Sequence, residues 1–481
     1  MALGKKFWVW DEDDMLAGVS TSDDLSDGGF SPLTDAINLI ASPGIAYQPT
    51  TPTDKSTNVT GTIIASAEDP LILGATRTYV DDEGHYYTWN GTTMTLARTD
   101  ATNPSGYVPG TTDMNAYENS VFTTTNTTVV KWTVDSVFTD NFITGLAGGV
   151  RHPLLTYEGF QYIGDGNLLK RMTDTSDSTP DTILTLAVGQ NIVALGIDPG
   201  SGKMLISTSQ GFNYSDTLNT TNKVLYYNGF SNKVDKVVPM DDLVTAFPFT
   251  EGQLYIAYGQ NLGYWNGAGA TFLKKFEIGF IGNELMYKHH FTNIGPTLYV
   301  IEKTKLWAHG PIRQGGEKVF YPAYKNQVNS NNLQNVAYVG SNILTFGFTT
   351  DKFYTFDTVS VAASNTQVLY SNENPLEAYN DGVWLRRIKV FWKNQVSNNV
   401  DPGSIRLFNE DGVITTIGQS GLLDLRNTSG AAKALKEIDV GGGTGTRIQQ
   451  IQFELILDTV NPGIRRIEFY GDPANQTTPQ S

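Results

Sequence analysis

The chain has 481 residues, more than the roughly 250–300 that a single hydrophobic core usually organises, so two or three domains are expected. Its formal net charge of −16 repels phosphate backbones, which argues against a protein that grips DNA or RNA. The absence of cysteine excludes disulfides and thiolate metal sites. No stretch approaches the roughly 20 apolar residues of a membrane helix, and no apolar core follows Lys5 and Lys6, so we expect neither membrane insertion nor a signal peptide.

Residues 1–70 are predicted to form an extended N-terminal arm. They are rich in Asp, Ser, Thr, Pro and Gly and show no regular hydrophobic period. Such a terminus is either partly disordered or ordered by lying on a neighbouring subunit. The apolar patch from Phe7 to Trp10 favours the subunit contact, because a freely solvated tail rarely carries two tryptophans.

Residues 71–361 have the texture of short β-hairpins. Aromatic or β-branched runs alternate with Gly, Asn and Asp, and three of these runs close with Asn-Gly, at residues 86–91, 225–229 and 262–267. Asn-Gly is a strong hairpin signal because both residues tolerate a positive φ.

A repeat becomes visible when the bulky residue at the end of each second strand is used as an anchor. The spacings between successive anchors run from 37 to 58 residues, and most are close to the roughly 40–50 residues of a four-stranded propeller blade. Short hairpins cannot bury their faces alone, whereas radial stacking buries both faces. The region is therefore predicted to be a β-propeller of about six to seven blades, with a non-repeating β-sandwich as the alternative. The seven anchors are Trp89, Trp132, Leu169, Tyr227, Trp265, Trp307 and Phe356.

Residues 362–473 are predicted to form a separate β-sandwich. Their apolar and polar residues alternate over longer runs, at residues 385–392, 448–457 and 464–470, as in antiparallel sheets with one buried face. Residues 474–481 form a polar tail. The predicted fold class is thus all-β: an extended arm, a propeller and a C-terminal sandwich.

No catalytic motif is found, so we predict that the protein is not an enzyme and holds no cofactor. There is no Gly-x-Ser-x-Gly elbow, and the glycine-rich residues 441–446 lack the Lys-Ser/Thr of a phosphate loop. His289 and His290 are adjacent, and on a strand they would point to opposite faces and could not share a metal. The other histidines, His85, His152 and His309, also lack a metal-binding spacing.

Weak candidates remain for metal and ligand binding. Carboxylates could bind a hard cation such as Ca²⁺, although solvated surface charge is the preferred interpretation. Tryptophans near turns could stack on sugar rings, although in propellers such residues usually fill the space between blades. The metal candidates are Asp11, Asp13, Asp81 and Asp82, and the binding candidates are Trp89, Trp265 and Trp307.

Several segments share the style of one family of proteins, and together they span most of the chain. They are residues 28–38, 81–91, 157–159 with 164–166, and 196–202. The lack of cysteine and the abundance of Thr, Asn and Gly agree with the same family. On these features the chain resembles virion structural proteins of tailed bacteriophages, specifically β-propeller tail components of the nozzle or tail-tip type.

This resemblance implies a structural component of a phage tail that forms subunit contacts and part of the wall of a DNA exit channel. The expected location is the virion tail, after synthesis in the host cytoplasm. The implied partners are further copies in a ring oligomer, other tail proteins such as an adaptor or fibre, and DNA that passes during ejection without specific binding. One alternative is a carbohydrate- or receptor-binding propeller that attaches to a host-surface glycan. Another is a propeller glycoside hydrolase, whose paired carboxylates would come from different blades.

Overall fold

A computed structural model describes the protein over most of its length. The division of contacts along the chain gives two compact units. The propeller unit comprises Pro52–Thr304 and Ser330–Asp357, and the second unit comprises Met1–Thr51, Lys305–Asn329 and Thr358–Ser481. Within the described residues, no helix is long and apolar enough to cross a membrane. The described residues are 5–11, 33–37, 39–42, 45–49, 53–68, 77–100, 104–133, 137–210, 221–276, 285–311, 318–325, 332–340, 343–348, 352–357, 367–371, 374–375, 382–409, 412–413, 422–440, 445–457 and 464–474.

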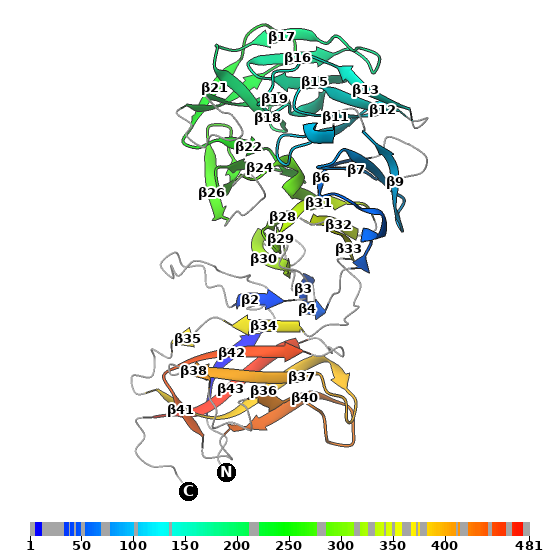
Figure 1. Cartoon of the computed structure of the whole chain (residues 1–481). Coiled ribbons are helices and arrows are strands. Elements are labelled where there is room, and N and C mark those ends of the chain that lie inside the picture. Colours follow the sequence, from blue (N-terminus) through cyan, green and yellow to red (C-terminus); the bar gives the residue numbers. More distant parts are fainter. Residues whose placement is uncertain are drawn as a thin grey trace. The chain divides into compact units, whose positions relative to one another are not determined.

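Antiparallel sheets of four consecutive strands follow one another along the chain (Figure 1). The first sheet contains β6 (Ile63–Glu68), β7 (Arg77–Asp81), β8 (His85–Trp89) and β9 (Met94–Thr99). The second contains β10 (Met114–Tyr117), β11 (Ser120–Thr124), β12 (Val129–Thr133) and β13 (Phe138–Ile143). The third contains β14 (Leu154–Tyr157), β15 (Phe160–Asp165), β16 (Leu168–Met172) and β17 (Asp181–Thr185). The fourth contains β18 (Gln190–Asp198), β19 (Lys203–Gln210), β20 (Asn222–Tyr227) and β21 (Lys236–Met240).

Three further sheets continue the series. In the fifth, β22 (Val244–Ala246) and β23 (Phe249–Thr250) both pair with β24 (Gln253–Tyr258), which is followed by β25 (Asn261–Trp265) and β26 (Ala270–Lys275). The sixth has the order β27 (Phe291–Ile294), β28 (Thr297–Glu302), β29 (Lys305–Pro311) and β30 (Lys318–Lys325), although the division of contacts counts β29 and β30 with the second unit. The seventh contains β31 (Leu333–Tyr338), β32 (Ile343–Phe348) and β33 (Lys352–Asp357), and its fourth strand is β5 (Thr53–Asp54) from the start of the chain.

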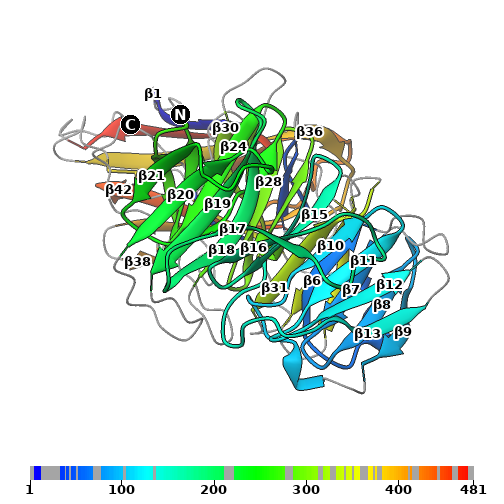
Figure 2. The same cartoon turned by 90° about the horizontal axis from the view of Figure 1, so that it is seen from above.

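The first strands of these sheets form a closed ring. Each contacts the first strand of the next sheet in the series, from β6 through β10, β14, β18, β22 with β23, and β27 to β31, and β31 in turn contacts β6. Seven sheets arranged around such a ring are a seven-bladed β-propeller. The predicted all-β propeller of six to seven blades is thereby confirmed, and Figure 2 shows the same sheets from above.

The seven sequence anchors all lie in the third strand of their sheets. Each side chain is buried, so every blade contributes one large core side chain from its third strand. The repeat in the sequence therefore reflects the packing of neighbouring blades. The anchors lie on β8 (Trp89), β12 (Trp132), β16 (Leu169), β20 (Tyr227), β25 (Trp265), β29 (Trp307) and β33 (Phe356).

The start of the propeller differs from the sequence-based boundary at residue 70. β6 is the first strand of the first sheet, and β5 pairs with β33 through Tyr354 opposite Asp54 and Thr355 opposite Thr53. The boundary was misplaced because β5 has two residues and carries no periodic pattern. Its pairing covers the free edge of the last sheet, which would otherwise expose unpaired backbone groups.

The second unit contains two larger sheets that together form a β-sandwich. Phe453 and Phe469, one from each sheet, are fully buried and their ring centroids lie 6.0 Å apart. One sheet has the order β1 (Lys5–Asp11), β43 (Ile464–Pro473), β36 (Val383–Val396) and β40 (Lys433–Asp439), with β41 (Thr446–Ile448) beside β36. The other has the order β2 (Leu33–Ile37), β34 (Gln367–Ser371), β42 (Gln450–Leu457), β37 (Gly403–Asn409) and β38 (Gly412–Val413), with β35 (Asn374–Pro375) beside β42 and β39 (Leu422–Asp424) beside β37.

The N-terminal strands β1 and β2 pair with strands of the sandwich of their own chain, whereas the sequence favoured an extended arm lying on a neighbouring subunit. β1 contains the apolar patch of residues 7–10 and pairs antiparallel with β43, with Trp8 opposite Phe469. β2 pairs with β34, and β3 (Leu39–Ser42) forms a hairpin with β4 (Ile45–Pro49). The patch therefore has an intramolecular role that local composition could not reveal, because its partner strand is more than 450 residues away.

Closure of the propeller gives a stability prediction for Ser56. Its Oγ accepts a hydrogen bond from the buried Phe353 N–H at 2.9 Å and donates its own proton to Asp54 Oδ1 at 2.5 Å. Ser56→Ala should lower the unfolding free energy by about 1–3 kcal/mol, since a buried N–H loses its partner. Chemical denaturation followed by intrinsic fluorescence measures the change.

Ser176→Ala is the matched control. Ser176 makes the same two bonds to Asp174 that Ser56 makes to Asp54, but it bridges no second strand. Its unfolding free energy should stay within about 0.5 kcal/mol of the parent. Equal losses in the two variants would contradict a closing role for Ser56.

Candidate functional site

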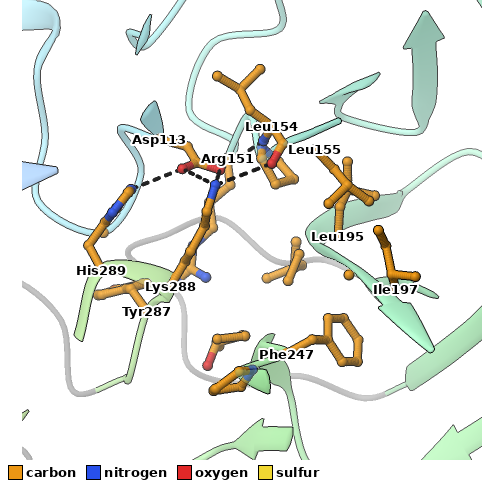
Figure 3. Close-up of a pocket in the computed structure, with 18 of the residues that line it drawn as sticks. Asp113, Arg151, Leu154, Leu155, Leu195, Ile197, Phe247, Tyr287, Lys288 and His289 are labelled. Atoms are coloured by element: carbon orange, nitrogen blue, oxygen red, sulfur yellow. Dashed lines mark hydrogen bonds and ion pairs between the residues drawn. The ribbon is translucent and has the colours of Figure 1, made fainter. Parts of the chain in front are cut away.

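A cavity of about 420 Å³ lies within the propeller unit, where the first strands of the second to sixth sheets meet (Figure 3). One part of its wall comes from β18 and from the β22–β23 segment, and the other from the start of β14 and the residues just before β10, β14 and β27. It is the natural candidate site, because ligands bind in concave, mostly apolar sites that carry a few polar groups. The lining includes Asp113, Arg151, Leu154, Leu155, Val193, Leu195, Ile197, Thr245, Phe247, Phe249, Tyr287, Lys288 and His289.

β-bulges in the first strands supply part of this lining. In four sheets the register against the second strand skips one residue of the first strand: Ile64, Val193, Thr245 and Gln334. A bulge changes the direction of its side chain relative to the regular alternation. Val193 and Thr245 line the cavity, and Ile64 and Gln334 line a small adjoining space that shares Tyr287 and His289 with it.

The remaining three sheets contribute charged residues instead. The first strands of the second, third and sixth sheets, β10, β14 and β27, pair in regular register. Asp113 directly precedes β10, and Arg151 lies three residues before β14. Lys288 and His289 belong to the 3-10 helix η4 (Lys288–His290), which leads into β27. Charge is therefore concentrated in the segments that enter these three first strands.

Asp113 connects the three sheets through its carboxylate. Its Oδ2 accepts the Leu154 N–H at 2.8 Å, and its Oδ1 accepts the Met114 N–H at 2.7 Å. The same Oδ1 lies 3.0 Å from Lys288 Nζ and 2.9 Å from His289 Nε2 (Figure 3). Burial disfavours the carboxylate, but Lys288 and the hydrogen bond from His289 outweigh it and hold the pKa of Asp113 well below its usual range. Asp113 is thus a permanent anion that fixes the cavity wall.

Arg151 and Tyr287 form a second buried contact in the wall. The guanidinium carbon lies 4.1 Å from the centroid of the tyrosine ring, a cation–π geometry. Burial lowers the pKa of Arg151 and raises the pKa of Tyr287 to about 12, so the phenol stays neutral. Gly110 permits this packing: its φ is +76°, and a Cβ there would lie 2.1 Å from the Tyr287 ring.

The two adjacent histidines are structural parts of this wall. They lie on η4, which corrects the expectation of a strand with opposite faces. His289 Nδ1 faces the Ser66 N–H at 3.5 Å while Nε2 faces Asp113, an arrangement that suits the neutral Nε2–H tautomer. Burial lowers the pKa of His289 and, more strongly, that of His290. In the part of the chain that the structure describes, no three His, Asp or Glu side chains are placed to hold a metal ion.

The three tryptophans proposed for sugar stacking are buried. Their exposed fractions are 1% for Trp89, 6% for Trp265 and 1% for Trp307. Trp265 Nε1 donates a hydrogen bond to the Tyr226 hydroxyl at 2.8 Å. In the propeller as described, these rings pack in the core, and none of the three lines the central cavity.

The described carboxylates proposed for metal binding are held by hydrogen bonds within the protein or lie apart, and they form no group of three that could hold a metal ion. Asp81 is the last residue of β7 and is fully buried, and it accepts hydrogen bonds from the Glu83 and His85 N–H groups and from the Tyr87 hydroxyl. Asp82 accepts the Thr62 N–H at 2.8 Å. Asp11 is the last residue of β1, and Asp13 lies outside the described residues.

Sequence reasoning missed the residues that build the cavity. Asp113 and Lys288 are 175 residues apart, and neither belongs to a motif. The bulge residues Val193 and Thr245 sit inside ordinary strand patterns, so only their register reveals them. The local signal that could have pointed to Asp113 is a polar residue directly before the first strand of a sheet. Many loops in this chain have such a residue, so the signal does not single out the cavity.

Comparison with known proteins gives likenesses of structure only. No protein-family model matches the chain, and no curated protein matches it. A streptogramin B lyase structure aligns with a TM-score of 0.47 at 8% identity, over 64% of this chain and 97% of that one. A structure of YCF48 bound to a D1 peptide aligns with a TM-score of 0.43 at 11% identity, over 66% of this chain and 99% of that one.

Asp113→Asn tests the carboxylate at the centre of the wall. The asparagine amide has one oxygen where the aspartate has two. It cannot accept hydrogen bonds from both the Leu154 N–H and the His289 Nε2–H, so one buried donor loses its partner. The expected loss of unfolding free energy is about 2–3 kcal/mol, mostly from these buried donors because Lys288 is half exposed. Asp174→Asn, in an exposed turn, is the control and should change stability little in the same denaturation experiment. A loss no larger than that of the control would refute the role of Asp113.

The buried histidines predict loss of stability in mild acid. In the unfolded chain both titrate near pH 6.5, whereas His289 and His290 have lowered pKa values in the folded protein. Below about pH 6.5 the unfolded state therefore binds more protons, and stability falls as the pH drops. Thermal unfolding midpoints at pH 7.5, 6 and 5 should decline, and His290→Gln should make the decline shallower. An unchanged slope in that variant would contradict this origin.

Proposed function

We propose that the protein is a structural component of a phage tail, of the nozzle or tail-tip type, rather than an enzyme. Its role is to provide a rigid wall and subunit contacts in a ring oligomer that includes other tail proteins, such as an adaptor or a fibre. Its location is the virion tail, after synthesis in the host cytoplasm. The resemblance in sequence style motivates this assignment, and the architecture is compatible with it.

The observation that carries the proposal is that, in both units, a strand near the start of the unit pairs with a strand near its end. β5 pairs with β33 in the propeller, and β1 pairs with β43 in the sandwich. In each unit this early strand, β5 or β1, is therefore held by a strand that comes much later in the sequence. A virion protein must hold its shape through assembly and DNA ejection, and such closure slows unfolding because the two ends must separate together.

The charge of the chain suits a passage for DNA. A net charge of −16 gives a wall that repels the phosphate backbone and limits adhesion during ejection. The arginines are enriched in residues 384–466, within the second unit, which leaves the propeller strands poor in this cation. This electrostatic character supports the proposal that DNA passes transiently without specific binding.

A binding propeller is the second candidate, and the central cavity is the observation that favours it. Its apolar wall and few polar groups are typical of a ligand site. Attachment to a host glycan through Trp89, Trp265 or Trp307 gains no support, because these rings are buried. The hydrolase alternative also gains none: the lining residues that the structure describes include one carboxylate, Asp113, and that carboxylate stays ionised.

The proposed role predicts that purified phage particles contain this chain in a fixed copy number. Quantitative mass spectrometry of the particles should find several copies per tail, and electron cryomicroscopy should show them as a ring. Particles assembled without the gene product should lack the ring and fail to complete the tail. Intact infectious particles without this chain would refute the proposal.

A further inference from the structure

We propose that the central cavity of the propeller binds a small amphipathic anion: a monocarboxylate with an extended apolar body. This is a binding site beyond the structural role proposed above, and it lies entirely within the propeller unit. Three independent features of the cavity support it: an apolar wall with exposed members, an unpartnered hydroxyl and a local excess of positive charge.

The apolar wall is large enough for a ligand and is incompletely covered. The cavity of about 420 Å³ falls in the usual range of small-molecule sites, roughly 300–1,000 Å³. Ile197 and Phe249 line it, yet 38% and 44% of their surfaces remain exposed to solvent. Figure 3 shows Leu195, Ile197 and Phe247 on the side opposite Asp113 and His289. An apolar body placed there removes this surface from water, which is the main source of affinity in such sites.

The hydroxyl of Thr245 supplies a polar contact that the protein leaves unmade. Thr245 is 3% exposed, and its Oγ1 has no hydrogen-bond partner among the described residues. Its position at the bulge of β22 places it in the cavity lining. A buried hydroxyl without a partner is costly, and buried polar groups in native proteins are nearly always paired. A carboxylate oxygen of the ligand is a suitable acceptor for it.

The charge of the lining favours an anion. Arg151 and Lys288 carry two positive charges against the single negative charge of Asp113, and the lowered pKa of His289 keeps that ring neutral at neutral pH. The cavity therefore carries one net positive charge inside a chain whose overall charge is −16. The positive charge of the lining attracts a monoanion and repels a cation.

Lys288 is the cation placed to meet the ligand. Its side chain is 46% exposed, and Nζ lies 3.0 Å from Asp113 Oδ1. Its contacts with the Met114 and Leu154 carbonyls are both 3.4 Å long, beyond the ordinary range for a hydrogen bond. A carboxylate is a stronger acceptor than these carbonyls, so the ligand can take one donor from Nζ while the bond to Asp113 remains.

The test uses the full chain and a fluorescent monoanion, 1-anilinonaphthalene-8-sulfonate, as the probe. Its emission should rise on binding, and decanoate should displace it. Decyltrimethylammonium, which has the same alkyl length and the opposite charge, should need at least about tenfold higher concentration, since one charge contact near a protein surface exceeds 1.4 kcal/mol. Equal displacement by the two ions, or no rise in emission, would overturn the proposal.

Variants locate the site. Phe249→Ser should weaken decanoate binding by about fivefold or more, and Phe272→Ser, a similarly exposed phenylalanine on β26 outside the cavity, should not. Thr245→Val should weaken binding about fivefold while leaving the fold as stable or more stable, because the hydroxyl has no partner in the free protein. Equal effects of Phe249→Ser and Phe272→Ser, or no effect of Thr245→Val, would refute this site.

Lys288→Gln separates charge from structure. The substitution removes the positive charge and keeps a neutral hydrogen-bond donor on the side chain, so the discrimination between decanoate and decyltrimethylammonium should fall by about tenfold. Lys236→Gln, at an exposed lysine on β21 that bonds the Gly267 carbonyl, should leave the discrimination unchanged. A purely structural Lys288 would alter stability without altering this ratio, and that result would overturn the assignment. Particle composition is measured separately, so failure here leaves the proposed tail role independently testable.

Discussion

Closure of the ring is the constraint on which the propeller depends. No four-stranded sheet of this size can cover both of its faces, so each first strand must contact the first strands of two other sheets. In an open row of sheets, the sheet at each end has a neighbour on one side only. In a closed ring, all seven sheets have a neighbour on both sides. The ring closes where β31 contacts β6, and β5 adds the fourth strand of the last sheet by pairing with β33. A two-residue strand from the start of the propeller therefore covers the edge that β33 would otherwise expose.

The fold could be predicted from the sequence because its repeated unit leaves a repeated packing residue. Trp89, Trp132 and Trp307 occupy equivalent third strands, and burial selects a large side chain at each. The N-terminal boundary could not be predicted in the same way. β1 and β5 are defined by partners at the far end of the chain, and neither composition nor period records such long-range pairing.

The candidate site was almost invisible in the sequence for a related reason. Its side chains come from irregular positions: bulges in some first strands and the segments before the others. A bulge residue such as Thr245 looks like any strand residue, and Asp113 finds its partners in two other sheets. The tryptophans that stood out in the sequence are core residues. In this propeller the regular positions maintain the fold, and the departures from regularity shape the central cavity.

The pairing of early with late strands sets the order in which the chain can fold during synthesis. β5 leaves the ribosome before any blade exists, and β33 follows roughly 300 residues later. At typical translation rates of about 5–20 residues per second, that is a wait of roughly 15–60 s. β1 must wait longer still for β43. Throughout this interval the nascent chain carries an open stack of sheets with an uncovered edge, so a truncated product retains an unpaired strand that only the complete polypeptide can cover.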